Sequence, residues 1–276
     1  MRKVNEVREV RLSELTSFPE SPFKTRNGPE LELLRESIRA NGVIVPLIVR
    51  PEEGGYQIIS GQRRADVCRE LGMESVPVIV KELDRDAAVI LFVDSNISRD
   101  QLLPSEKAFA YRMKLEAVKH QRAQLGYRGK SIEYLARFSP ESRTQIQRFI
   151  RLTELEKPLL DLVDEGRIAL TPAVELSYLS KPEQCVLIEA IESEQGTPTL
   201  SQAVRLRDLS REGCLDEETV YGIMREEKGN QKEVVRVTAD RIRRYFRKDA
   251  TPREMEETII RALDNWYRRR NRDKER

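Results

Sequence analysis

Two patterns of hydrophobic residues, one with helical spacing and one typical of strands, occur in the first ninety residues of the chain. Residues 29–41 carry apolar side chains at helical spacing, and Gly42 follows as a residue suited to a helix C-cap. Three short apolar runs instead have the length and β-branched composition of strands: 45–50, 56–60 and 76–80. The turn that begins at Gly61 ends the second run and is expected to open a helix through Leu71. The pattern predicts an α+β domain over residues 1–100.

From residue 86 onward the pattern becomes helical, and Pro or Gly residues separate the periodic segments. A helical domain is therefore predicted over residues 101–227. A polar segment, 228–237, is expected to lead into a strand, followed by helices over 239–247 and 252–270. These last elements define a small α/β module over residues 228–276. The helices predicted before it are 86–95, 104–125, 131–138, 142–152, 156–165, 172–179, 182–194, 199–211 and 215–227.

Composition narrows the class of protein. Charged residues make up 35% of the 276 residues, yet the net charge is only +2, so a nucleic-acid surface requires local clustering of Arg and Lys. No apolar run approaches a membrane span, and the first residues lack the apolar core of a signal peptide, which favours a cytoplasmic protein. Three scattered cysteines argue against disulfide or zinc sites and favour core positions. One histidine, His120, leaves little room for His-based catalysis.

Residues 131–152 have the pattern of a helix-turn-helix. Apolar residues give the first helix an inward face, and Pro140 prevents it from continuing. Ser142 can cap the second helix, whose Ile146, Phe149 and Ile150 lie at helical spacing. The alternative is an ordinary helical hairpin with a solvated polar face.

The outward face of that second helix carries the side-chain types that read base edges. Arg and Gln pair with guanine and adenine in the major groove, and a recognition helix presents such contacts from its first turns. Other basic residues nearby can hold phosphates. The DNA-contacting residues predicted from this pattern are Ser142, Arg143, Thr144, Gln145, Gln147 and Arg148 on the second helix, with Arg151, Arg128 and Lys130 for the phosphate backbone.

A second polar motif, Gly61-Gln62-Arg63-Arg64, lies where a predicted strand gives way to a helix. Backbone N–H groups at a helix start, together with two arginines, suit a phosphate. A later cluster of Asp94, Asn96 and Asp100 can help to hold a hard cation beside it. Each motif alone is also compatible with a solvated turn or an ordinary helix end.

In this order the motifs resemble the ParB family of DNA-partition proteins over roughly residues 10–195. Four segments carry the resemblance: Ser37-Ile38 with Asn41 to Arg50, Gly55 to Arg64, Ser95 to Leu102 with Pro104 to Ala108, and the helix-turn-helix with its sequel to Gly166. The first domain is accordingly expected to have the ParB/sulfiredoxin-like fold. Because the second segment holds no cysteine at its phosphate turn, sulfiredoxin chemistry is not expected.

The resemblance implies CTP with Mg²⁺ in the first domain, double-stranded DNA containing a centromere-like site, a homodimeric clamp and a ParA-type ATPase partner. Asn96 would also be a ligand of the Mg²⁺. Carried over by motif, the nucleotide-binding residues would be Gly42, Pro46, Ile48, Gly61, Gln62, Arg63, Arg64, Asn96 and Arg99. The alternative function is a helix-turn-helix transcriptional regulator without a segregation role, and a phosphotransferase on the same fold is a third possibility.

Two positions depart from the family pattern. Gln62 and Ser95 stand where the family carries Glu. Gln cannot act as a general base, and Ser95 removes a carboxylate that could hold Mg²⁺. We therefore expect weak or absent CTP hydrolysis. At the C-terminus an apolar stripe from Met255 to Tyr267 is expected either to pack within its own module or to join a second subunit.

Overall fold

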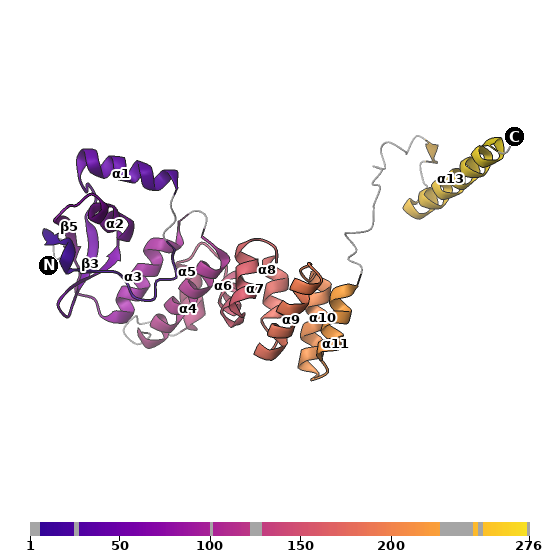
Figure 1. Cartoon of the computed structure of the whole chain (residues 1–276). Helices are drawn as coiled ribbons and strands as arrows, with labels where there is room; N and C mark the ends of the chain where they lie inside the picture. Colours follow the sequence, from indigo (N-terminus) through magenta and orange to yellow (C-terminus); the bar gives the residue numbers. More distant parts are fainter. Residues whose placement is uncertain are drawn as a thin grey trace. The chain divides into compact units, whose positions relative to one another are not determined.

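The structure is a computed structural model, and it describes residues 6–24, 28–99, 102–121, 129–226, 245–247 and 251–274. Its contacts divide the chain into two units, Met1–Glu226 and Glu227–Arg276. The first unit contains both the α+β region and the long helical region, and the second contains one long helix (Figure 1).

A five-stranded mixed sheet forms the N-terminal end of the first unit (Figure 1). The strand order is β1-β5-β3-β4-β2. β3 pairs antiparallel with β4 and parallel with β5, while β1 is antiparallel to β5 and β2 is parallel to β4. The three strands predicted from apolar runs are therefore the central ones. The strands are β1 (Val7–Arg11), β2 (Leu15–Thr16), β3 (Leu47–Glu52), β4 (Gly55–Ser60) and β5 (Ser75–Val80).

Two helices accompany the sheet: α1 (Pro29–Asn41) and α2 (Gln62–Glu70). They pack on one another, and α2 also packs on β3. Leu47 and Val49 of β3 are fully buried, as are Ala65 and Val67 of α2, because alternate strand residues and one helix face point to the same core. This packing fixes the start of α2 at the end of β4, where the predicted phosphate turn lies.

Nine helices follow the sheet in the described part of the first unit. α4 is the central element, since it packs against α3, α5, α6 and α7. One apolar cluster runs from Phe18 and Ile59 beside the sheet to Met224 in the last helix. The helices are α3 (Arg85–Ile97), α4 (Pro104–Gln121), α5 (Ser131–Arg137), α6 (Arg143–Arg151), α7 (Lys157–Asp164), α8 (Leu170–Leu176), α9 (Lys181–Ser193), α10 (Leu200–Arg211) and α11 (Glu217–Arg225).

The second unit contains α13 (Pro252–Lys274) and a short segment, 245–247. The strand expected near residues 233–237 lies outside the described residues, as do most of the helix expected over 239–247 and the site residue Arg128. Within the described residues, no helix is both long and apolar enough to cross a membrane.

The expectation for the cysteines was only partly right. Cys68 is fully buried in the core between α2 and the sheet, as a small apolar side chain should be. Cys185 and Cys214 are exposed, so the prediction of a core position was wrong for both. Cys185 lies on the outer side of α9, and Cys214 lies in the turn after α10, where neither side chain can reach the apolar cluster.

Candidate nucleotide and DNA interfaces

The phosphate turn begins at Gly61, the residue between β4 and α2. Gly61 has φ 106°, in the left-handed region that side chains rarely adopt. A Cβ placed there would lie 2.8 Å from Cγ of Leu47 and 3.0 Å from Nη2 of Arg64. Both the backbone conformation and the close approach of these side chains therefore require glycine. The turn exposes the first N–H groups of α2, which have no side-chain cap.

Residues from three parts of the chain meet at this turn and enclose a small cavity of about 40 Å³. The start of α2 contributes Gly61, Gln62 and Arg63, and the end of α3 contributes Asn96 and Arg99. Apolar rings line the same cavity: Phe18 stacks on Phe92, with ring centroids 4.2 Å apart, and Phe23 lies 5.5 Å from Phe92. The fold therefore brings together five of the nine predicted nucleotide-binding residues.

Two polar atoms in this cavity are buried without a hydrogen-bond partner: Oε1 of Gln62 and Nε of Arg63. The amide of Gln62 is oriented by its Nε2, which donates to Asp66 at 2.8 Å and leaves the oxygen facing elsewhere. An unmet buried donor on a guanidinium suits an anion, and an unmet buried acceptor suits a cation or an N–H or O–H donor. The donor set therefore fits a phosphate-bearing ligand with a bound cation.

The pKa of Arg99 reflects the burial and the crowding of positive charge at this cavity. Burial of the guanidinium lowers its pKa, and the neighbouring positive charge of Arg63 lowers the pKa further, while Glu106 opposes the shift. Two guanidinium groups that repel one another at the same cavity are stabilised when an anion binds between them.

Arg64 is turned away from this cavity. Its Nη1 donates to the backbone carbonyls of Val45 and Pro46, the second at 3.0 Å. Gly42 ends α1 and Pro46 precedes β3, whereas Ile48 packs against the apolar cluster that contains Phe18 and Phe92. None of these four residues lines the cavity of Gly61 and Arg63. Arg64 thus ties the α1–β3 loop to α2, and a ligand that contacts both groups would have to extend beyond the cavity.

Asn96 is buried, and its Nδ2 donates to the carbonyl of Phe92 at 2.7 Å, which leaves its oxygen available for a metal. The neighbouring Asp94 instead pairs with Lys114, whose side chain is only 2% exposed, and thereby joins α3 to α4. Among the described residues, no three Asp, Glu, His or Cys side chains come together in a cluster that could hold a metal ion. Asp100 lies outside the described residues.

The helix-turn-helix is formed by α5 and α6. Ser142 caps α6, since its Oγ accepts a hydrogen bond from the N–H of Gln145 at 3.3 Å. Ile146 and Phe149 are buried against the helical core, whereas Ile150 is half-buried. The apolar face predicted from the sequence therefore holds α6 against α4 and α5.

The opposite face of α6 is open to solvent. Arg143, Thr144, Gln147 and Arg148 are exposed, and Gln145 is half-buried. Arg143 pairs with Glu133 of α5 at 3.3 Å, and Lys130 lies exposed just before α5. In the described part of the chain, Arg148 has no recorded polar partner. This surface can present hydrogen-bond donors to base edges and phosphates, as the sequence predicts.

A buried polar network supports the turn between α5 and α6. Nζ of Lys107 lies 2.7 Å from Glu141, and the hydroxyl of Tyr111 contacts Glu141 and lies 2.7 Å from Oγ of Ser139. Burial is the largest effect on Glu141 and raises its pKa, but hydrogen bonds from Lys107 and Tyr111 outweigh it, so the pKa is lowered overall. Sequence reasoning missed this network, because its partners lie 28 to 34 positions apart.

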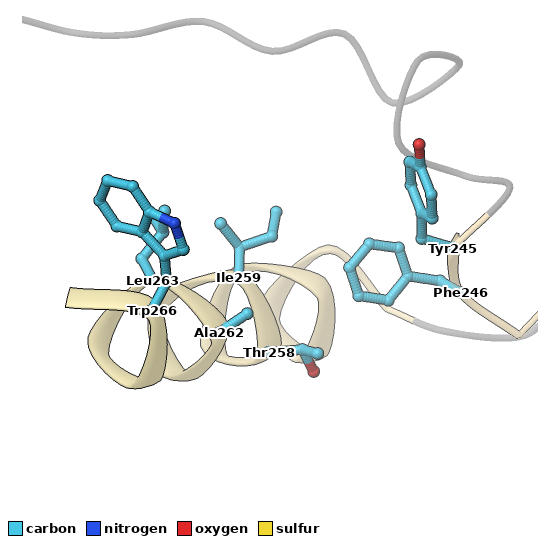
Figure 2. Close-up of a pocket in the computed structure, with 7 residues that line it drawn as sticks. All are labelled: Tyr245, Phe246, Thr258, Ile259, Ala262, Leu263 and Trp266. Atoms are coloured by element: carbon cyan, nitrogen blue, oxygen red, sulfur yellow. The ribbon is translucent and has the colours of Figure 1, made fainter. Parts of the chain in front are cut away.

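An apolar groove of about 550 Å³ lies on the second unit. Ile259 and Leu263 of α13 project from the same side of the helix as Trp266, and Phe246 points toward α13 from the preceding segment (Figure 2). Leu263 is 58% exposed and Trp266 is 56% exposed. The apolar stripe expected from the sequence is thus present and only partly covered by its own unit.

Comparison with known protein families defines the class of the first domain: residues 1–97 match the ParB N-terminal domain. The chromosome-partitioning protein Spo0J of Thermus thermophilus is 30% identical over 198 residues, which cover 71% of this chain and 68% of that protein. Stage 0 sporulation protein J of Bacillus subtilis is 32% identical over 164 residues, 59% of this chain and 55% of that protein. The chain belongs to the ParB family of partition proteins.

Two solved structures of ParB from Caulobacter crescentus are also similar. The complex with the centromeric parS site has a TM-score of 0.43 at 22% identity and covers 74% of this chain and 99% of that one. The complex with CTP-γ-S has a TM-score of 0.32 at 27% identity and covers 68% of this chain and 99% of that one. Because these TM-scores are low, the family assignment rests on the sequence matches.

Proposed function

We propose that this protein is a sequence-specific DNA-binding partition factor that reads its site with α6. The observation that carries the proposal is the exposed Arg- and Gln-bearing face of a capped α6 whose other face is fixed in a buried core. Such a helix can enter a major groove with little loss of side-chain packing. Membership of the ParB family supports the partition role over that of a transcriptional regulator.

The cavity at Gly61 is proposed to bind the phosphates of a nucleotide, with CTP and Mg²⁺ as the expected ligand. Support comes from the unmet Nε of Arg63, the crowding of Arg63 and Arg99, and the unmet oxygen of Gln62. When bound, the nucleotide would supply the charge that joins α2 to the end of α3. A cavity of about 40 Å³ is too small for a whole nucleotide. The cavity would therefore hold phosphates only, and the rest of the nucleotide would extend beyond it.

Hydrolysis of that nucleotide is proposed to be weak or absent. The side chain of Gln62 donates to Asp66, and an amide at this position cannot accept a proton from water. Ser95 donates to the carbonyl of Phe92 at 2.9 Å and offers no carboxylate to a cation. Binding and release would then control the DNA complex more than turnover would.

A homodimer is proposed to form through the apolar groove of the second unit. Leu263, Trp266 and Tyr267 are each more than half exposed on one helix, and a second copy offers the same surface in return. The variant Leu263→Asp should be monomeric in sedimentation analysis, whereas Asp264→Asn, at an exposed position of the same helix, should keep the wild-type mass. A ParA-type ATPase partner remains a prediction from the family alone.

The test of DNA reading begins with recovery of the cognate site, by sequencing genomic fragments that the full-length protein retains. Fluorescence anisotropy on a duplex with that site and on a scrambled duplex then measures specificity. Gln147→Ala should reduce the preference for the cognate duplex by about 1–3 kcal/mol. The matched control Arg39→Gln, on α1 beside the sheet, should leave it unchanged. Equal affinity of the wild type for both duplexes would contradict the proposal.

Nucleotide binding is tested separately with labelled CTP, ATP and GTP in the presence of Mg²⁺, with and without the cognate duplex. CTP should bind selectively, and Arg63→Gln should weaken it about tenfold or more, since a charge-assisted contact to phosphate is lost. Arg8→Gln, an exposed arginine of β1, serves as the control. Binding that survives Arg63→Gln unchanged would place the nucleotide elsewhere.

A further inference from the structure

Tyr178, in the turn after α8, brings two arginines from different helices together. Tyr178 is 42% exposed. The guanidinium carbon of Arg151, at the end of α6, lies 4.2 Å from the ring centroid, and that of Arg211, at the end of α10, lies 5.2 Å away. Both distances are within the range of cation–π contact. The recognition helix thereby meets α10 through one aromatic side chain.

The positive charge of Arg151 is not neutralised by its partners. Its Nε donates to Oγ of Ser177 at 3.0 Å, and its Nη2 donates to the carbonyl of Ser177 at 2.6 Å. Both acceptors are uncharged, and Ser177 is 2% exposed, so the guanidinium is held in a fixed orientation. Arg211 is exposed, and within the described part of the chain its one recorded contact is the ring of Tyr178. Two uncompensated cations therefore lie beside one ring.

The carboxylates on the neighbouring helices are already engaged. Glu175 and Asp208 both pair with Arg207. Glu156 pairs with Lys181 at 3.0 Å, and Glu183 accepts from Ser180 and Ser210. Glu212 follows Arg211, but one residue along a helix turns a side chain by about 100°. None of these carboxylates pairs with Arg151 or Arg211, so both guanidinium groups beside Tyr178 lack an acidic partner among the described residues.

This charge is continuous with the exposed face of α6. Arg148 precedes Arg151 by three positions and Gln147 by four, so all three side chains share one side of the helix. The strip Arg148-Arg151-Tyr178-Arg211 thus leads from the proposed reading surface to the end of α10. Guanidinium groups and a tyrosine hydroxyl are donors that proteins direct at backbone phosphates.

We propose that Arg151, Tyr178 and Arg211 form an anchor for a phosphate of the DNA backbone, which extends from the end of the helix-turn-helix to α10. The inference rests on the proposed DNA-binding function and extends it to α10. The anchor adds affinity without reading sequence, and it fixes the register in which α6 lies on the duplex. Arg151 orients the ring, and Arg211 and the Tyr178 hydroxyl face the phosphate.

The test measures binding of the full-length protein to its cognate and scrambled duplexes between about 50 and 200 mM salt. Arg211→Gln should reduce the slope of log K against log salt by about 0.9, the value for one phosphate contact. The ratio of the wild-type affinity to the affinity of Arg211→Gln should therefore fall about three- to fourfold from the lower to the higher salt concentration, equally on both duplexes. Arg211→Lys should keep most of the slope, because it keeps the charge.

Arg225→Gln is the matched control, since Arg225 is an exposed arginine on α11 that pairs with Glu194. It should leave the slope unchanged. A wild-type slope in Arg211→Gln, with the same melting temperature, overturns the anchor while DNA binding stands. A loss equal in Arg211→Gln and Arg211→Lys also overturns it, since that result indicates packing instead of charge. Absence of DNA binding by the wild type would refute the proposed function itself.

Discussion

The two polar sites of the first unit differ in whether the polar atoms of their side chains have hydrogen-bond partners. The exposed face of α6 is open to water, so the polar atoms of Gln147 and Arg148 can hydrogen-bond to water in the absence of a ligand. At the phosphate turn, Gln62 and Arg63 each carry a buried atom without a partner. A buried unmet donor or acceptor is costly, whereas an exposed one is not. If both proposed ligands bind, the turn would gain stability from the nucleotide, whereas the exposed face of α6 would gain a binding partner without a change in the protein's own stability.

The largest expected effect concerns the open site. The double variant Gln147→Ala/Arg148→Ala should lose about 100-fold or more in affinity for the cognate duplex, since each good base or phosphate contact contributes about 1–3 kcal/mol. Its melting temperature should match the wild type, because both side chains are exposed. Anisotropy and thermal unfolding measure the two quantities. A large loss of stability would show that the outer face of α6 has a structural role.

At the cavity beside Gly61, substitution of Arg63 should weaken nucleotide binding without destabilising the ligand-free protein. Arg63→Met should weaken CTP binding about tenfold or more, because a charge-assisted contact to phosphate is lost. The ligand-free protein should be as stable as the wild type or more stable by up to about 1 kcal/mol, since an unmet buried donor is removed and the only ion pair lost among the described residues is the one with the exposed Glu30, at 3.5 Å. Thermal unfolding with and without Mg²⁺ and CTP separates these effects. Clear destabilisation of the ligand-free variant would contradict the comparison.

A smaller effect is expected at the support of the turn between α5 and α6. Tyr111→Phe removes the hydroxyl that contacts Glu141 and Ser139 but keeps the buried ring. We expect unfolding to become easier by about 1 kcal/mol, the usual contribution of one hydrogen bond. Denaturant unfolding measures this change, and Tyr221→Phe on α11 is a control. No change in Tyr111→Phe would mean that the network does not stabilise the turn.

The smallest effect concerns pH. Lys107 and Tyr111 hold the pKa of Glu141 below its usual value of 4.5, against the opposing effect of burial. A carboxylate whose pKa is lowered by folding stabilises the protein above its unfolded pKa and loses that contribution as pH falls through the folded pKa. Between about pH 5 and pH 3 the wild type should therefore lose more stability than Glu141→Gln, because this interval contains the usual pKa of a glutamate and extends below it. Parallel acid-unfolding curves would contradict this assignment.

The sequence predicted the elements that depend on local periodicity. The helix over residues 29–41 and the two helices of the helix-turn-helix lie where apolar spacing and capping residues indicate them. The three central strands begin or end within two residues of the predicted runs. β2 was not predicted as a strand, because its two residues are ordered by pairing with β4 and by no pattern of their own.

The sites were less predictable, since their contacts join distant positions. The motif at Gly61 gave the residues of the turn but not the direction of Arg64, which is set by carbonyls 18 and 19 positions away. Asp94 was expected beside a cation, yet it pairs with Lys114. Arg151 was predicted to contact phosphate, and the sequence did not reveal its hydrogen bonds to Ser177, 26 positions later. No spacing rule in the sequence encodes these pairings.

The most direct test of the account is the affinity of the full-length protein for its recovered genomic site and for a scrambled duplex, measured by anisotropy at fixed salt with and without Mg²⁺ and CTP. We predict a strong preference for the genomic site, loss of that preference in Gln147→Ala/Arg148→Ala, and a change of the complex on addition of CTP that Arg63→Gln weakens. Equal binding to both duplexes, unaffected by the variants on α6, would contradict it.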